Sequence, residues 1–92
     1  MKNFTFNNEK NLKLKKERNI SFEKIINYIK NGYLLDVIEN KNYKNQKIFI
    51  IKIKNYVFLV PFVENENEIF LKTIFPSRKF TKIYLGDKNE NL

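Results

Sequence analysis

The stretch that decides the fold is KIFIIKIKNYVFLVPFVE, from Lys47 to Glu64. In its first part, Lys47 to Lys54, isoleucine and phenylalanine are interspersed with lysine, which is typical of a β-strand. Its second part, Tyr56 to Glu64, is apolar until its last residue and predicts a buried strand. Lys54-Asn55 predicts a tight turn between the two, because asparagine accepts a positive φ. Pro61 has no N–H to donate, so we expect it at a bulge or an edge position.

Three further segments predict strands. Phe4 to Phe6 alternates apolar and polar residues and indicates a short first strand. Tyr33 to Glu39 (YLLDVIE) and Ile69 to Phe75 (IFLKTIF) flank the central stretch. They are separated from it by a polar loop at residues 41–46 and by a turn at residues 65–67.

Three segments predict helices. Residues 9–18 contain good helix formers, with Asn7 or Asn8 as the cap and Asn19 as the stop. Ser21 is the expected cap of a second helix, which ends at Gly32. Its apolar residues follow the spacing of an amphipathic stripe and comprise Phe22, Ile25, Ile26 and Ile29. Pro76-Ser77 opens a short basic helix over residues 78–84.

This element order predicts the fold class. We expect an α+β fold in one small domain, residues 1–92, with a short N-terminal strand and two helices. A four-stranded antiparallel sheet and a short C-terminal helix follow. Residues 86–92 are polar and are expected to form a frayed tail.

The composition excludes many enzyme classes. The 92 residues include no cysteine, no histidine and only two glycines. Thiolate chemistry, imidazole acid–base chemistry and phosphate-binding glycine loops are therefore excluded, and no metal or other cofactor is expected. No apolar run approaches the roughly 20 residues of a membrane helix, and no signal peptide is visible, so we expect a cytoplasmic protein without membrane contact.

The net charge of +8 favours phosphate-bearing partners. The cations are 16 lysines and only two arginines, Arg18 and Arg78. Lysine, asparagine and isoleucine share AT-rich codons, so codon bias is the alternative explanation for part of the charge.

Two stretches carry a resemblance to a known family. The first has Phe6-Asn7, Glu9-Lys10, Lys16 and Ile20-Ser21-Phe22 in order, and the second has VPFVE (60–64) followed by TIFPSRKFTKIY (73–84). The first is similar to an aromatic–Asp–Glu–x–Lys opening with a Gly-x-x-Phe-type helix start. The second is similar to a Val-x-Tyr-x-Glu strand end and an Ile-Ser-x-Arg-Lys-x-Thr segment. In this order they resemble the BrnT family of bacterial toxins, RelE-like ribonucleases of type II toxin–antitoxin systems.

The resemblance implies a fold and an activity. It implies a BrnT/RelE-like domain that cleaves RNA, free or on the ribosome, and so inhibits translation. It also implies neutralisation by a cognate antitoxin, expected to be a ribbon-helix-helix DNA-binding protein. Three positions depart from the family. Asn65 stands where an arginine is usual, Arg18-Asn19 replace a His-Gly pair, and YKNQK (43–47) replaces a Gly-Glu-Glu-Arg loop.

Without histidine, cleavage by 2′-OH attack needs other groups to accept a proton, stabilise the phosphorane and donate a proton. Arg78 is the candidate phosphate clamp, because its planar fork matches phosphate oxygens. Glu64, at the end of its strand, is the candidate base, expected to face Arg78, and Tyr84 is the candidate donor. The alternatives are a surface ion pair of Arg78 with Glu64 or Glu68, a solvated turn carboxylate and a packed tyrosine.

Lysines complete the expected RNA site. Lys79 and Lys82 flank Arg78, and Lys72, or a loop lysine such as Lys47, is a substitute for the arginine missing at position 65. Lys10 and Lys16 match the resemblance. A solvated face is the alternative for Lys79 and Lys82 and for the first-helix lysines.

Two classes of function thus stay open. The first is a metal-independent ribonuclease toxin, favoured by Glu64 and by Ser77-Arg78-Lys79. The second is a non-catalytic module that binds nucleic acid, or an antitoxin-bound co-repressor, and Asn65 favours it.

Overall fold

The central hairpin pairs strand β3 (Lys47–Ile53) with strand β4 (Tyr56–Glu64). In the computed structural model, which describes residues 2–86, the two strands are antiparallel from Lys47↔Phe62 to Ile53↔Tyr56. Lys54 and Asn55 form the turn with φ of 50° and 67°, the left-handed geometry of a two-residue hairpin turn. The predicted turn is confirmed.

The remaining strands make the sheet mixed. Strand β2 (Leu34–Glu39) pairs antiparallel with β3, and β5 (Glu68–Leu71) pairs antiparallel with β4. Strand β1 (Asn3–Phe6) pairs parallel with β5, so the order is β1-β5-β4-β3-β2. The expected α+β class holds, but the sheet is not a purely antiparallel four-stranded one. A parallel neighbour needs a long connection, and the helices and the β2–β4 segment supply it between β1 and β5.

The last predicted strand, Ile69 to Phe75, is broken. Leu71 pairs with Phe62, and Phe75 pairs with Leu59. The three residues between Leu71 and Phe75 therefore lie opposite the two residues between Leu59 and Phe62 on β4. The extra residue separates β5 from a short β6 (Phe75–Pro76). Pro61 lies beside this break, as expected for a residue without an N–H, and its carbonyl accepts a hydrogen bond from the Lys72 backbone N–H at 2.8 Å.

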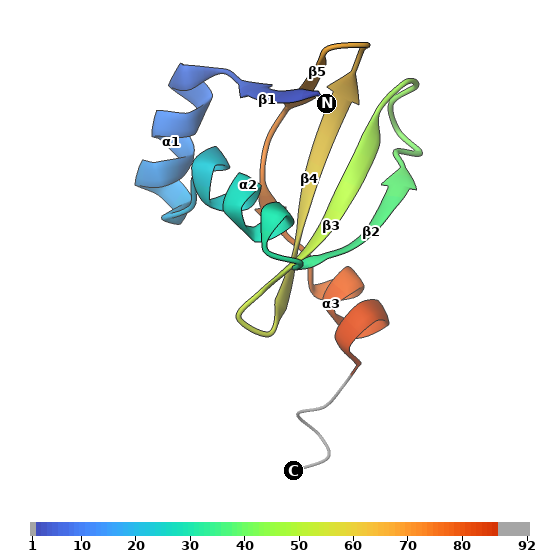
Figure 1. Ribbon diagram of the computed structural model, residues 1–92. Coiled ribbons are helices and arrows are strands. Elements are labelled where there is room, and N and C mark those ends of the chain that lie inside the picture. The colour runs from blue at the N-terminus through green and yellow to red at the C-terminus, as the bar shows by residue number, and fades with distance from the viewer. Residues whose placement is uncertain (1, 87–92) are drawn as a thin grey trace.

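Helices α1 (Asn8–Arg18) and α2 (Phe22–Lys30) cover one face of the sheet (Figure 1). Asn7 caps α1, Asn19 ends it in the left-handed conformation, and Ser21 caps α2, all as predicted. Phe22 and Ile25 of the predicted stripe are fully buried. They pack on the main core, whose sheet residues include Phe49, Ile51, Val60, Phe62 and Leu71.

One buried polar side chain joins the two helices. Asn11 is only 4% exposed. Its Oδ1 accepts a hydrogen bond from the Phe22 backbone N–H at 2.8 Å, and its Nδ2 donates to Glu23 Oε1 at 2.8 Å. The end of α1 is fixed separately, because Arg18 donates to the Ile74 carbonyl at 2.6 Å. This arginine therefore has a structural role.

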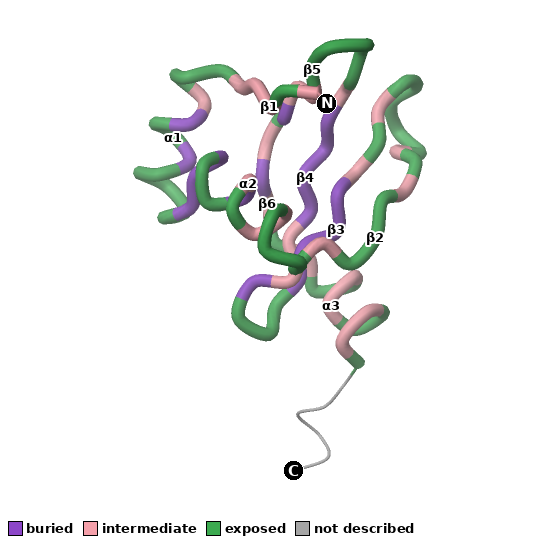
Figure 2. The backbone as a smooth tube through the Cα atoms, in the orientation of Figure 1, coloured by how far each residue is buried: buried purple, intermediate pink, exposed green. Residues whose placement is uncertain are grey.

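Helix α3 (Arg78–Leu85) lies on the other face and covers only part of it. Ile50, Val57 and Leu59 form a second small core there, packed by Phe75, Phe80 and Tyr84. Figure 2 shows buried residues concentrated in β3 and β4 and exposed residues at 41–45 in the loop between β2 and β3. Beyond Gly86, the tail expected from the sequence lies outside the described residues. No helix within residues 2–86 is long and apolar enough to span a bilayer.

Candidate nucleic-acid interface

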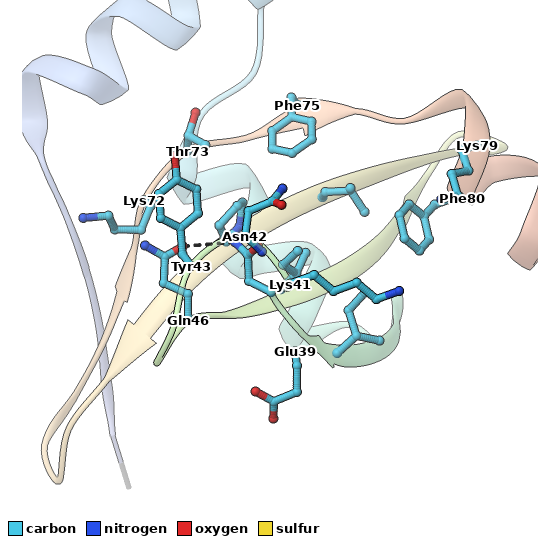
Figure 3. A pocket seen from close by; sticks show the side chains of 15 residues that line it. Glu39, Lys41, Asn42, Tyr43, Gln46, Lys72, Thr73, Phe75, Lys79 and Phe80 are labelled. Carbon is cyan, nitrogen blue, oxygen red and sulfur yellow. Dashed lines mark hydrogen bonds between the residues drawn. The ribbon is translucent and has the colours of Figure 1, made fainter.

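The part of the sheet that α3 leaves uncovered forms a groove of about 780 Å³ (Figure 3). Its floor is apolar and comes from β2, β3 and β4. Its sides are the 40–46 loop, the connection between β5 and β6, and the first turn of α3. The floor residues are Ile38, Ile48, Leu59 and Pro61.

Cations and aromatic rings line this groove together. Its lysines are Lys41, Lys72 and Lys79, and its aromatic residues are Tyr43, Phe75 and Phe80. The Lys72 ammonium lies 5.4 Å from the centre of the Phe70 ring, and the Lys79 ammonium 5.8 Å from that of Phe80. Lysines beside aromatic rings are the combination with which proteins bind single-stranded nucleic acid, through its phosphates and its bases respectively.

The 40–46 loop is built by amide hydrogen bonds. The Asn40 N–H donates to the Gln46 carbonyl at 3.0 Å, and the Asn40 side chain donates to Gln46 Oε1 at 3.2 Å. Asn40 Oδ1 in turn accepts from the Asn42 N–H at 3.0 Å. These bonds close the loop and hold Lys41, Asn42 and Tyr43 against the groove. Sequence reasoning treated this segment as a plain polar loop, although Asn-x-Asn is a recognisable Asx-turn signal.

Two of the predicted RNA-binding lysines, Lys72 and Lys79, line the groove. Lys82 is exposed on α3 and does not line it. Lys10 and Lys16 belong to α1, which packs on the other face of the sheet. The structure thus separates the expected lysines into two faces and brings only Lys72 and Lys79 together.

Glu64 does not face Arg78. Its Oε1 accepts a hydrogen bond from Lys2 at 2.8 Å, and its Oε2 lies 3.6 Å from the Lys47 ammonium. The Lys2 hydrogen bond and the two positive charges lower the pKa of the Glu64 carboxyl. A residue two positions after the core residue Phe62 points to the same sheet face, which is the helix-covered one. The expected Glu64–Arg78 arrangement is therefore wrong in geometry, and Glu64 is an ion-pair partner at the strand end.

Arg78 is the first residue of α3 and is exposed. Within residues 2–86 its guanidinium forms no salt bridge, so the alternative of an ion pair with Glu64 or Glu68 is not realised there. It precedes Lys79, which lines the groove. Two polar residues of this segment, Ser77 and Thr81, bond the backbone. Ser77 caps α3 by accepting from the Phe80 N–H, and Thr81 Oγ1 accepts from the Val57 N–H at 2.8 Å.

Tyr84 joins α3 to the edge strand. Its hydroxyl donates to Asp36 Oδ2 at 2.7 Å, while Asp36 Oδ1 accepts from the Val37 N–H at 2.8 Å. The bond to Asp36 raises the pKa of Tyr84, and the bond from Tyr84 lowers the pKa of Asp36. A raised pKa makes Tyr84 a weaker acid, and it does not line the groove.

The comparisons with known proteins add no relative: no family model, no curated protein and no solved structure matches this chain. Residues 2–86 also contain no cluster of acidic, histidine or cysteine side chains that could hold a metal ion. The function therefore has to be argued from the groove and its side chains.

Proposed function

We propose that this protein binds single-stranded RNA in the groove and acts as the toxin of a type II toxin–antitoxin system. Its proposed activity is RNA cleavage without a metal, which inhibits translation. The observation that carries the proposal is the groove itself, where three lysines and three aromatic rings surround an apolar floor. The chain also carries the two stretches that resemble the BrnT family.

The spacing of the lysines favours a polymer over a small anion. The Lys72 N–H bonds the Pro61 carbonyl, and Lys79 lies two residues past Ser77, whose N–H bonds the Val57 carbonyl. Pro61 and Val57 are four residues apart on β4, so these backbone positions are separated by about 13 Å. Lysines spread along the groove in this way suit the successive phosphates of an extended strand.

Cleavage would use groups from the groove rather than Glu64 and Tyr84. Glu39 borders the groove, but its carboxylate points away from it in Figure 3. Lysine is then the available proton carrier. Arg78 precedes the groove residue Lys79 without lining the groove itself, and it stays the candidate clamp for the phosphorane charge. Lysine thus replaces Glu64 and Tyr84 of the set expected from the sequence.

The proposal includes a protein partner and a location. A cognate antitoxin, a ribbon-helix-helix protein, would silence the toxin by covering the basic groove with an acidic segment. Since RNA and ribosomes are the targets, we place the protein in the cytoplasm.

The second candidate is a non-catalytic RNA-binding or antitoxin-binding co-repressor. One observation favours it, namely that Glu64, Arg78 and Tyr84 lie apart and that Glu64 and Tyr84 are hydrogen-bonded to other residues. It keeps the same groove but predicts binding without product.

The test uses end-labelled single-stranded RNA with a chelator present. We expect binding and cleavage products from the wild type, and loss of both in the Lys72→Ala/Lys79→Ala double variant. The matched control is Lys13→Ala/Lys30→Ala, which removes the same charge from two exposed lysines of α1 and α2, on the helix-covered face of the sheet. Binding without product after long incubation supports the RNA-binding form of the second candidate, whereas absence of RNA binding overturns the proposed function and leaves only the antitoxin-binding form.

A further inference from the structure

We propose that the groove takes up an unpaired nucleobase of the bound RNA and that Asn42 reads the hydrogen-bonding edge of that base. This inference rests on the proposed RNA binding and adds a specificity-determining residue to it. Three features of the groove carry it: its apolar floor, its rings and one unused amide.

The floor suits the flat apolar face of a base. Ile38, Ile48, Leu59 and Pro61 lie side by side in the register of β2, β3 and β4, with Ile38 opposite Ile48 and Ile48 opposite Pro61. The volume of about 780 Å³ falls within the range of pockets for small organic ligands. Bases taken out of a stack are held in this way, between apolar or aromatic side chains.

Asn42 is the groove residue whose backbone is held by a hydrogen bond while its side-chain amide makes none within residues 2–86. Asn40 and Gln46 bond each other, and Asn40 Oδ1 fixes the Asn42 backbone N–H. Within residues 2–86 the Asn42 side chain itself has no hydrogen-bond partner. Figure 3 shows its amide between the Tyr43 ring and Phe75, directed toward the Phe75 side.

The chemistry of the amide sets the expected preference. One carbonyl acceptor beside two N–H donors matches the edge that adenine forms with its exocyclic amine and N7, an edge that cytosine and uracil lack. The phosphates on either side would contact Lys72 and Lys79, which supply affinity but no base preference. Affinity and preference should therefore respond to different residues.

The test measures the affinities of labelled adenine, cytosine and uracil homopolymers at one salt concentration. We expect the wild type to prefer the adenine strand by roughly five- to hundredfold, the range of one good bidentate contact. Asn42→Ala should reduce this preference to within about twofold. Asn45→Asp and Asn42→Asp add the same charge to the same loop, but Asn45 does not line the groove, so only Asn42→Asp should alter the preference.

The outcomes separate this inference from the proposed function. RNA binding with no base preference, or with a preference that Asn42→Ala leaves intact, overturns the role of Asn42 and leaves RNA binding standing. Equal affinity for duplex and single-stranded RNA overturns base uptake, since paired bases are not available. Absence of RNA binding overturns the proposed function and this inference with it.

Discussion

Glu64 and Arg78 lie at opposite ends of strand β4. The Ser77 N–H donates a hydrogen bond to the Val57 carbonyl at 2.9 Å, which places the start of α3 beside the first residues of β4. Glu64 is seven residues further along, so about 23 Å of extended strand separates the two positions. Their faces differ as well, because Glu64 follows the helix-side residue Phe62, whereas α3 packs on the other side. Any phosphate bound at Arg78 is out of reach of the Glu64 carboxylate.

Replacing Glu64 should therefore leave RNA binding intact. We expect Glu64→Gln to change RNA affinity less than twofold and to lower the free energy of unfolding by at most about 1 kcal/mol, the usual value of an exposed ion pair. Because the Lys2 hydrogen bond lowers the pKa of Glu64, this stabilisation is present at neutral pH and is lost as the pH falls through the lowered pKa. RNA titration and urea unfolding measure the two effects. A large loss of affinity in a folded Glu64→Gln variant would restore Glu64 to the site.

Replacing Asn11 should destabilise the helical layer. Asn11→Ala leaves the buried Phe22 N–H without its acceptor, so we expect a loss of about 1–3 kcal/mol. Asn8→Ala is the matched control, since Asn8 is exposed at the start of the same helix. Urea unfolding of both variants gives the comparison. Equal effects would show that the Asn11 contacts contribute nothing beyond helix propensity.

The hydroxyl of Thr81 should hold α3 against β4. Thr81→Val keeps the shape but removes the acceptor of the Val57 N–H, so a loss of about 1–3 kcal/mol is expected. RNA affinity should fall too, because α3 carries Lys79 and Phe80. Thr81→Ser retains the hydroxyl and should restore most of both quantities. Failure of serine to rescue would contradict a hydrogen-bonding role.

The Tyr84–Asp36 bond should stabilise the protein across the neutral range. The pKa of Asp36 is lowered, so its contribution is present above about pH 4 and disappears as the pH falls through the lowered value. The pKa of Tyr84 is raised, so its contribution is present below about pH 10 and disappears as the pH rises through the raised value. Tyr84→Phe should lower the melting temperature at pH 7 and should converge with the wild type at both extremes. Tyr56→Phe, at an exposed tyrosine, is the control, and a pH-independent difference would argue against the bond.

Local signals in the sequence predicted the local structure correctly. The stripe of Phe22 and Ile25 with the Ser21 cap predicted α2, and Asn7 and Asn19 marked both ends of α1. These features depend on neighbours within one or two helical turns, which the sequence displays directly. The Lys54-Asn55 turn follows from the same kind of signal.

Long-range pairing could not be predicted in the same way. The parallel β1–β5 pair joins residues more than sixty positions apart, and the Arg18 bond to Ile74 joins residues 56 positions apart. The strand break after Leu71 depends on how Pro61 presents its carbonyl, which no periodicity reveals. The groove is formed by three segments that are far apart in the sequence, residues 38–48, 59–61 and 72–80. Lys72 and Lys79 were therefore found by their charge, while Lys41, Asn42 and Tyr43 were missed.

The most direct test of RNA binding in the groove is the salt dependence of RNA affinity. For a single strand, the slope of log affinity against log salt changes by about 0.7 for each phosphate contact. We expect the Lys72→Ala/Lys79→Ala variant to lose about 1.4 from the wild-type slope. Lys13→Ala/Lys30→Ala, with the same net charge, should keep the wild-type slope. An equal loss in both double variants would mean that RNA contacts the lysine surface at large, and would contradict binding in the groove.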